Sequence, residues 1–244
     1  MSESLLTSRT GPDGSIVVLT LNRPKARNAL DAGLLADISG ALRQAEADPG
    51  AQVVILTGAG PVFCAGMDLR AYASGGDFGS LTWFYREGIS KPTIAALNGS
   101  AVGGGLELAI ACDLMVAAED ARIGLPEVKR GMYAGGGGTT LAQRIPLAVA
   151  LELGLTGDTI PARRAAELGL VNVVVPADQV LDAATDLAAR VAANAPLALA
   201  MTKKLIRERR WGSPEESAAV FRSADAREGA TAFAEKRRPA WTGK

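Results

Sequence analysis

Two glutamates and a run of three glycines are the residues in this chain whose types and spacing could do chemistry. Gly103, Gly104 and Gly105 precede an apolar helix, and Glu107 lies half a turn into that helix. The free N–H groups at a helix start favour negative charge, and glycines there let a ligand approach the backbone closely. A carboxylate among apolar neighbours is costly to bury without a partner or a chemical role. Glu127 follows 20 residues later, so two carboxylates are available for acid–base work.

The chain contains no histidine. Catalysis by Ser-His-Asp or Cys-His groups is therefore excluded, and so are metal sites that use histidine ligands. Acid–base chemistry near neutral pH must fall to carboxylates, or else to a lysine or tyrosine whose pKa is shifted.

Three segments, taken together, identify a family. They are Lys91–Asp113, which holds the glycines and Glu107, then Phe63–Leu69 with the letters FCAGMDL, and Ile123–Gly131 with the letters IGLPEVKRG. A glycine run alone would equally suit a phosphate-binding turn or a packing need. In combination the segments resemble the crotonase, or enoyl-CoA hydratase/isomerase, superfamily, closest to enoyl-CoA hydratase. The resemblance runs from about Ile16 to the C-terminus.

The resemblance implies a reaction at an acyl-CoA thioester. The backbone N–H groups of Met67 and Gly104 would form an oxyanion hole for the thioester oxygen, where negative charge develops. Glu107 would orient and deprotonate a water molecule, and Glu127 would exchange the proton at the substrate carbon. Coenzyme A enters as part of the substrate, and no metal or other cofactor is implied.

The same two glutamates have structural alternatives. Glu107 could be a first-turn carboxylate favoured by the helix dipole. Glu127 follows Pro126 and could begin a surface helix, with the nearby Lys129 and Arg130 as partners. The family spacing and the oxyanion motif favour the catalytic interpretation of both residues.

The resemblance also implies residues that contact coenzyme A. Lys25 lies where the family contacts the nucleotide. Phe233 and Lys236 belong to a closing Phe-x-Glu-Lys-Arg motif that could reach a ligand of the same or a neighbouring subunit. Ala26 corresponds to a backbone contact with the nucleotide. Ala65, Asp68 and Leu69 correspond to the family's pocket for adenine and pantetheine. The structural alternatives to these contacts are solvated charges in the loop that holds Lys25 and an ordinary amphipathic helix end at Phe233 and Lys236. The acyl chain would lie beside residues 71–89, and Met132-Tyr133-Ala134 stands where the family often has a proline.

The elements that must position these residues follow an alternating pattern. Asp31 is a plausible N-cap for an amphipathic helix that runs to about Ala47, and a polar, Pro-broken loop precedes it. Continuous apolar runs predict buried parallel strands. The predicted strands are 15–21, 53–57, 93–97, 114–118 and 171–175. Helices are predicted from residues 135–138, 146 and 161, and only helices follow Pro176.

This pattern predicts an α/β core followed by a helical C-terminal part. The resemblance makes the fold more specific: a crotonase-like spiral of ββα units with a C-terminal α-helical trimerisation region. We expect residues 1–195 to form the catalytic and CoA-binding core and residues 196–244 to form the helical region, giving a homotrimer or a hexamer built as a dimer of trimers.

Composition agrees with a globular enzyme. The chain has 244 residues, 48% of them hydrophobic and 21% charged, and its formal net charge is zero. Bulk electrostatics therefore favour neither nucleic acid nor an anionic membrane as a partner. Cys64 and Cys112 lie in apolar surroundings, which favours buried thiols over a disulfide. No secretory pattern or membrane span is predicted, so we expect a cytoplasmic protein.

We therefore predict an enoyl-CoA hydratase that adds water to trans-2-enoyl-CoA to give 3-hydroxyacyl-CoA. Within the same fold, an isomerase, a carnitinyl-CoA-type dehydratase or a ring-modifying acyl-CoA enzyme remain open. A non-catalytic acyl-CoA-binding assembly protein is the alternative from another class. A dinucleotide-binding protein fits poorly, because its glycines belong in the first βα turn, with an acidic residue after the next strand.

Overall fold

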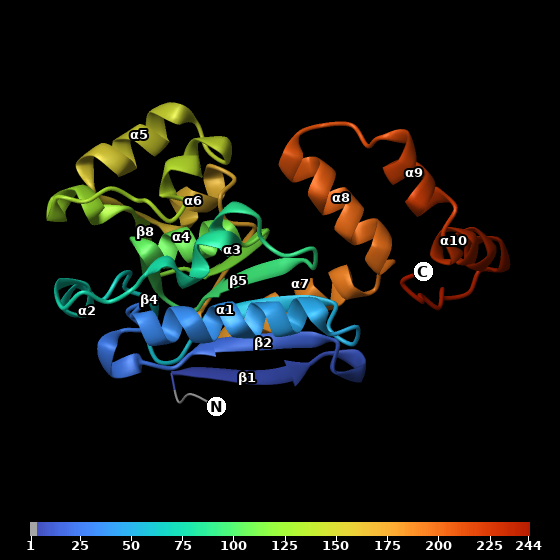
Figure 1. Ribbon diagram of the computed structural model, residues 1–244, viewed down its shortest axis with the longest axis horizontal. Coiled ribbons are helices and arrows are strands. Elements are labelled where there is room, and N and C mark those ends of the chain that lie inside the picture. Colours follow the sequence, from blue (N-terminus) through green and yellow to red (C-terminus); the bar gives the residue numbers. More distant parts are fainter. Residues whose placement is uncertain (1–3) are drawn as a thin grey trace.

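The computed structural model describes residues 4–244, and most of its strands belong to one six-stranded sheet (Figure 1). The strand order is β1-β2-β3-β5-β7-β10. These strands are β1 (Leu5–Thr10), β2 (Ile16–Leu21), β3 (Val53–Gly58), β5 (Thr93–Leu97), β7 (Leu114–Ala118) and β10 (Val173–Val175). All neighbours are parallel except β1 and β2, which pair antiparallel with Leu5 opposite Leu21.

A second sheet has four short strands in the order β4-β6-β8-β9. Its members are β4 (Val62–Cys64), β6 (Ser100–Val102), β8 (Arg122–Gly124) and β9 (Thr159–Pro161). Each ββα unit places one strand in each sheet: β5 is followed directly by β6 and then by the helix α4 (Gly104–Ala111). The chain therefore turns from the long sheet to the short one immediately before the glycine run, and α4 contacts strands of both sheets.

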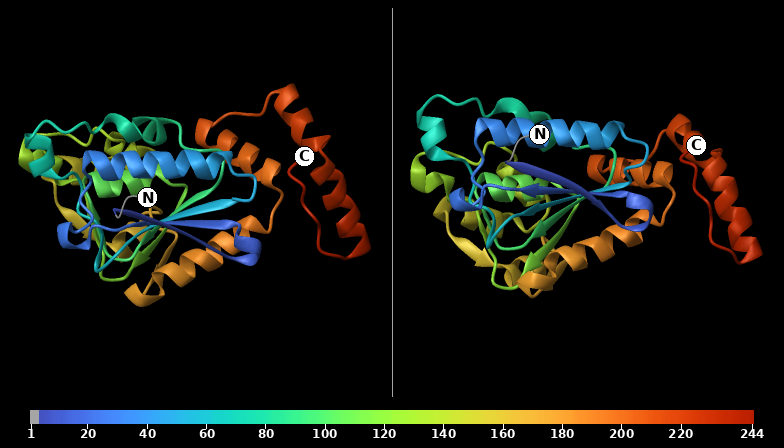
Figure 2. Two further views of the ribbon diagram at one scale, coloured as in Figure 1. Left: turned by 60° about the horizontal axis from the view of Figure 1, so that its bottom comes forward. Right: turned by 90° about the horizontal axis from the view of Figure 1, so that it is seen from below.

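Helices cover both faces of the long sheet (Figure 2). On one face lies α1 (Ala32–Ala47), whose cap Asp31 accepts a hydrogen bond from the Leu34 N–H at 2.8 Å, as the sequence predicts. Its inner side chains Ile38 and Leu42 are fully buried, and each such aliphatic side chain contributes about 2 kcal/mol. The opposite face is covered by α7 (Val180–Ala192), which contacts five strands of the sheet.

The segment between β4 and β5 forms two short helices, α2 (Leu69–Ala73) and α3 (Thr82–Arg86), and α3 contacts α4. The remaining α-helices before the C-terminal region are α5 (Leu147–Thr156) and α6 (Ala162–Glu167). Residues 4–244 also contain six 3-10 helices: η1 (Pro12–Gly14), η2 (Pro24–Ala26), η3 (Gly79–Leu81), η4 (Pro126–Arg130), η5 (Gly138–Gln143) and η6 (Ala177–Gln179). The helix predicted to open at residues 135–138 is thus a 3-10 helix that begins at Gly138.

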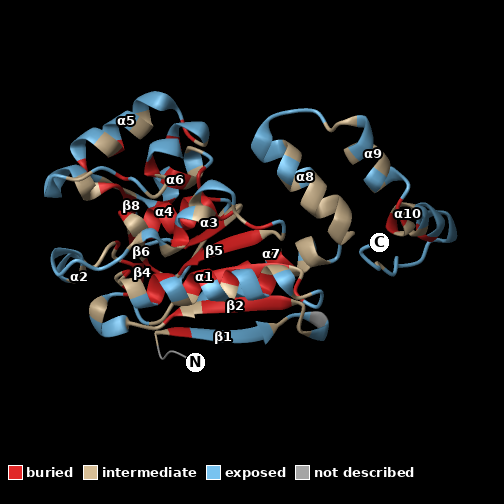
Figure 3. Ribbon diagram, in the orientation of Figure 1, coloured by how far each residue is buried: buried red, intermediate tan, exposed pale blue. Residues whose placement is uncertain are grey.

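The C-terminal helices leave the core (Figures 1 and 2). They are α8 (Pro196–Glu208), α9 (Pro214–Phe221) and α10 (Ala224–Glu235). Figure 3 shows the contrast in burial: most strands of the long sheet and α4 are largely buried, whereas α9 and α10 alternate between exposed and intermediate residues with few buried ones. Across residues 4–244, no helix is both long and apolar enough to cross a bilayer.

Candidate active site

The oxyanion-hole candidates lie on two loops that meet at the start of α4. Gly103 has φ 57° and ψ −131°, a conformation that favours glycine, and it turns the chain from β6 into the helix. Gly66 has φ 91°, and a Cβ there would lie 3.3 Å from the Gly104 nitrogen. A Cβ on Gly104 would lie 3.5 Å from the Met67 nitrogen. The two backbone nitrogens are therefore close neighbours, and position 66 requires glycine, because its φ is positive and a Cβ would lie 2.8 Å from the Val102 carbonyl oxygen.

Both N–H groups are available to a ligand. Gly104 begins α4 and so has no partner one turn earlier in the helix. Within residues 4–244, neither the Gly104 nor the Met67 N–H donates a hydrogen bond to another group. Met67 is held in place by its neighbours, because the Leu30 N–H donates to the Gly66 carbonyl and the Asp68 N–H donates to the Leu30 carbonyl, each at 2.8 Å. Two fixed donors with a helix N-terminus behind one of them can stabilise an oxyanion.

Glu107 is a buried carboxylate held by the backbone. Its side chain is 7% exposed, and its Oε1 accepts a hydrogen bond from the Gly138 N–H at 2.9 Å. Burial raises the pKa of Glu107, the Gly138 N–H opposes that change, and the charge of Glu127 raises the pKa further. A hydrogen bond from a backbone N–H stabilises the ionised form of a carboxylate.

Glu127 differs in this respect. It lies in η4, and its two carboxylate oxygens are buried with no hydrogen-bond partner in residues 4–244. Burial is the main cause that raises the pKa of Glu127. A Cβ on Gly103 would lie 3.1 Å from the Glu127 Oε1, so this carboxylate faces the turn that leads into α4. Glu107 thus has a backbone donor that Glu127 lacks, and two carboxylates in unlike environments can divide acid and base roles.

One cavity of about 2480 Å³ brings these groups together. It is lined by Met67, Gly104, Glu107 and Glu127, and it continues between the core and α8. Two of the predicted CoA contacts, Ala65 and Leu69, also line it. In the part of the chain that the structure describes, no cluster of three or more Cys, Asp or Glu side chains could hold a metal ion.

The other predicted ligand contacts do not line this cavity. Lys25 and Ala26 form η2, which is followed by Arg27, a residue that does line it. The Ala65 N–H donates to the Arg27 carbonyl at 3.0 Å, so the loop that carries Lys25 runs beside the loop that carries the oxyanion hole. Phe233 and Lys236 lie at the end of α10, away from the core, and Phe233 is 88% exposed.

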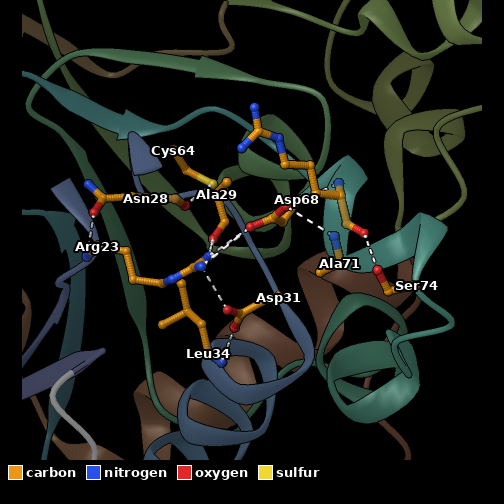
Figure 4. Close-up of polar contacts among 10 residues, drawn as sticks. Arg23, Asn28, Ala29, Asp31, Leu34, Cys64, Asp68, Ala71 and Ser74 are labelled. Carbon is orange, nitrogen blue, oxygen red and sulfur yellow. Dashed lines mark hydrogen bonds and ion pairs between the residues drawn. The ribbon is translucent and has the colours of Figure 1, made fainter. Parts of the chain in front are cut away.

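Asp68 has a structural role that the sequence analysis did not assign. Its carboxylate caps α2 by accepting from the Arg70 and Ala71 N–H groups, each at 3.2 Å, and it pairs with Arg23 at 3.3 Å (Figure 4). The Ala71 N–H is the largest cause of a lowered Asp68 pKa. Arg23 also pairs with Asp31, at 2.8 Å. An aspartate directly before a helix is a typical N-cap, and that signal was present in the sequence.

Asn28 links the loop that carries Lys25 to the turn between β3 and β4. It is fully buried and has φ 54°, and its amide group donates to the Ala59 and Val62 carbonyls at 2.9 and 2.8 Å. The Asn28 carbonyl accepts from the Cys64 thiol at 3.1 Å. Burial raises the pKa of Cys64 to about 12, so this thiol is a buried structural group.

The site thus combines two free backbone N–H donors with a pair of carboxylates at one cavity. Comparison with known proteins gives the family. The model of the enoyl-CoA hydratase/isomerase family matches residues 11–244. A carnitinyl-CoA dehydratase of Proteus mirabilis is 40% identical over 268 aligned positions, with all of both chains covered.

Solved structures agree. The crystal structure of an enoyl-CoA hydratase from Mycobacterium tuberculosis H37Rv is 48% identical, covers all of both chains and has a TM-score of 0.92. That of a carnitinyl-CoA hydratase from Mycobacterium avium is 39% identical, again with full coverage, and has a TM-score of 0.79. The chain therefore belongs to the enoyl-CoA hydratase/isomerase, or crotonase, family, and its α/β fold is the crotonase fold. These relatives make it a crotonase-family lyase of the acyl-CoA hydratase or dehydratase kind.

Proposed function

We propose that this protein is an enoyl-CoA hydratase that adds water across the double bond of a trans-2-enoyl-CoA to give a 3-hydroxyacyl-CoA. The observation that carries the proposal is the shared cavity. Glu107 and Glu127, in unlike environments, face the same space as the free N–H groups of Met67 and Gly104. Hydration needs a base, an acid and a site for the thioester oxygen, and this cavity supplies all three.

The reaction divides between the groups as follows. Glu107 takes a proton from water while the water oxygen bonds to C3, and the electron pair of the double bond moves to the thioester oxygen. The N–H groups of Met67 and Gly104 hold that oxygen while it is negative. Glu127 then delivers its proton to C2, and the electron pair returns to form the new C–H bond. The unpartnered oxygens of Glu127 support its assignment as the protonated group.

Dehydration of a 3-hydroxyacyl-CoA is the same reaction in reverse, and it is the second candidate. The 40% identity to a carnitinyl-CoA dehydratase favours it about as strongly as the enoyl-CoA hydratase structures favour hydration. The two candidates differ in the acyl group rather than in the carboxylates.

The test is loss of the enoyl-thioester absorbance with crotonyl-CoA and longer 2-enoyl-CoA substrates. Removal of one acid–base group typically lowers the rate by about 10²- to 10⁴-fold. We expect losses of that size in kcat for Glu107→Gln and Glu127→Gln, with binding of a saturated acyl-CoA retained. Glu152→Gln, on the exposed side of α5, is the matched control and should leave the rate unchanged.

Other outcomes would redirect the assignment. Tight acyl-CoA binding with no hydration at any chain length would reject the hydratase assignment. Isomerase, carnitinyl-CoA and ring substrates would then be tested, and failure of all of them would favour a non-catalytic acyl-CoA-binding protein.

We also propose that the chain assembles into a homotrimer or a hexamer through its C-terminal helices. Large apolar side chains are exposed on or beside α8, α9 and α10, namely Ile206, Trp211, Phe221 and Phe233. Apolar surface of this kind is typical of interaction sites. In such an assembly Phe233 and Lys236 could contact the ligand of a neighbouring subunit. Light scattering after size-exclusion chromatography tests the assembly, and a monomer at micromolar concentration would reject it.

A further inference from the structure

Tyr85 is a polar residue of the active-site cavity that the proposed reaction does not use. It lies on α3, which contacts α4, and its half-buried side chain lines the same cavity as Glu107. A Cβ placed on Gly136 would lie 3.1 Å from the Tyr85 Cε2 and 2.9 Å from the Glu107 Oε2. The phenol ring and the carboxylate therefore flank the same glycine.

The Tyr85 hydroxyl keeps its proton and has no hydrogen-bond partner. Burial is the main cause that raises the pKa of Tyr85, and the nearby charge of Glu107 raises it further. In the part of the chain that the structure describes, no group donates to or accepts from this hydroxyl. A neutral O–H donor that borders a ligand cavity and has no partner in residues 4–244 suits an acceptor atom of a ligand.

The direction of α4 indicates which part of the substrate Tyr85 faces. The oxyanion hole is at Gly104, where the thioester carbonyl would lie, and Glu107 is one turn further along the helix. The next turn presents Ile110 and Ala111, which also line the cavity. The acyl chain beyond C3 thus has room past Glu107, along the part of α4 that α3 covers. Tyr85 lines the cavity from α3, with its ring beside the Glu107 carboxylate across Gly136, so the phenol borders this continuation of the chain.

We propose that Tyr85 is a specificity-determining residue that favours acyl groups carrying a hydrogen-bond acceptor oxygen on C4 over plain hydrocarbon chains. The inference rests on the proposed function, because it takes the placement of the substrate from it. A hydrocarbon chain would remove the phenol from water and give it no partner, and that costs binding. An oxygen on C4 would accept its hydrogen bond. Sites built to hydrogen-bond a substrate group discriminate strongly against analogues that lack the group.

The experiment uses two substrates of equal length: trans-2-hexenoyl-CoA and 4-methoxy-2-butenoyl-CoA, in which an oxygen replaces the fifth carbon. The measured quantity is the ratio of kcat/KM for the oxygen-containing substrate to that for the hydrocarbon. We expect Tyr85→Phe, which removes only the hydroxyl, to lower this ratio about tenfold, chiefly because the hydrocarbon is accepted better. Tyr133→Phe is the control: Tyr133 also lines the cavity but is 75% exposed, so its ratio should stay at the wild-type value.

Two results would overturn the proposal. One is an unchanged ratio in Tyr85→Phe. The other is an equal loss of kcat on both substrates, which would make Tyr85 part of the reaction itself. Binding of the saturated pair, hexanoyl-CoA and 4-methoxybutanoyl-CoA, is measured by calorimetry in parallel. If the wild-type protein hydrates neither substrate, the proposed function fails, and the calorimetric ratio still decides the role of Tyr85.

Discussion

The lack of a Cβ at Gly136 leaves room for the Glu107 carboxylate, and Gly136→Ala tests whether the proposed hydration depends on this space. The added methyl group would lie 2.9 Å from the Glu107 Oε2 and 3.2 Å from its Cδ, with the Tyr85 ring at 3.1 Å on the same side. Ordinary contact begins at 3.4 Å, so the carboxylate oxygen must move by about 0.5 Å. Gly136 does not have a positive φ, so alanine fits the backbone there and the effect comes from the contact alone.

A displacement of about 1 Å at a reacting group can cost about 10²-fold in rate, so half that distance corresponds to about tenfold. We therefore expect kcat/KM for enoyl-CoA hydration to fall at least about tenfold in Gly136→Ala. KM should change little, since the contacts that hold coenzyme A lie elsewhere. The matched control is Gly154→Ala in α5, where nothing lies within 4 Å of the new methyl. That variant should keep full activity and gain about 0.5–1 kcal/mol of stability. A folded Gly136→Ala protein with kcat/KM within twofold of wild type would refute the reasoning.

Two further predictions concern stability. Because burial holds the pKa of Glu127 above its ordinary value of 4.5, the folded protein binds this proton more tightly than the unfolded chain. The stabilisation that comes from this bound proton is complete below pH 4.5 and is lost as pH rises. Glu127→Gln should therefore become more stable relative to wild type as pH rises. A difference in unfolding free energy that does not change with pH would contradict this. Asp113 pairs with Lys203 of α8 at 2.6 Å and with Arg207 at 2.9 Å, with Lys203 and Asp113 both largely buried. Asp113→Asn should lower the free energy of unfolding in denaturant by about 3 kcal/mol. The control Glu119→Gln removes the exposed Glu119–Arg163 pair and should lower it by less than about 1 kcal/mol. Equal losses would reject the idea that Asp113 anchors α8.

The elements that the sequence predicted correctly are those with a long apolar pattern or a clear cap. The strands 53–57, 93–97 and 114–118 are continuous apolar runs, and the structure confirms them as β3, β5 and β7. The strand β1 was not predicted, because only its first residue, Leu5, is buried, and the exposed Leu6 with the polar residues after it shows no alternation. The strands β4, β6, β8 and β9 have three residues each, too few for any period to be visible.

The site shows the same division between local and distant information. The family resemblance carried by local motifs indicated Met67, Gly104, Glu107 and Glu127, and the structure brings all four to one cavity. The Gly138 N–H that holds Glu107 lies 31 residues away, and no spacing rule joins the two. The glycine run Gly135 to Gly138 was a usable signal, because Gly136 and Gly138 have no room for a side chain. A Cβ on Gly138 would lie 2.4 Å from the Cβ of Ala134.

Arginine side chains hold the helix α4 at its C-terminus, away from the Gly104 N–H at its N-terminus. Its N-terminus has no side-chain cap, which leaves the Gly104 N–H free for a substrate oxygen. At its other end the Ala111 carbonyl accepts from Arg207 at 2.7 Å, and the Cys112 carbonyl accepts from Arg144 at 2.6 Å. Cations at a helix C-terminus are favourable, so these contacts stabilise α4 without occupying its active end. Because Arg207 belongs to α8, the C-terminal helices are joined to the helix that carries Glu107, and a change in how α8 docks would act on the oxyanion hole through α4.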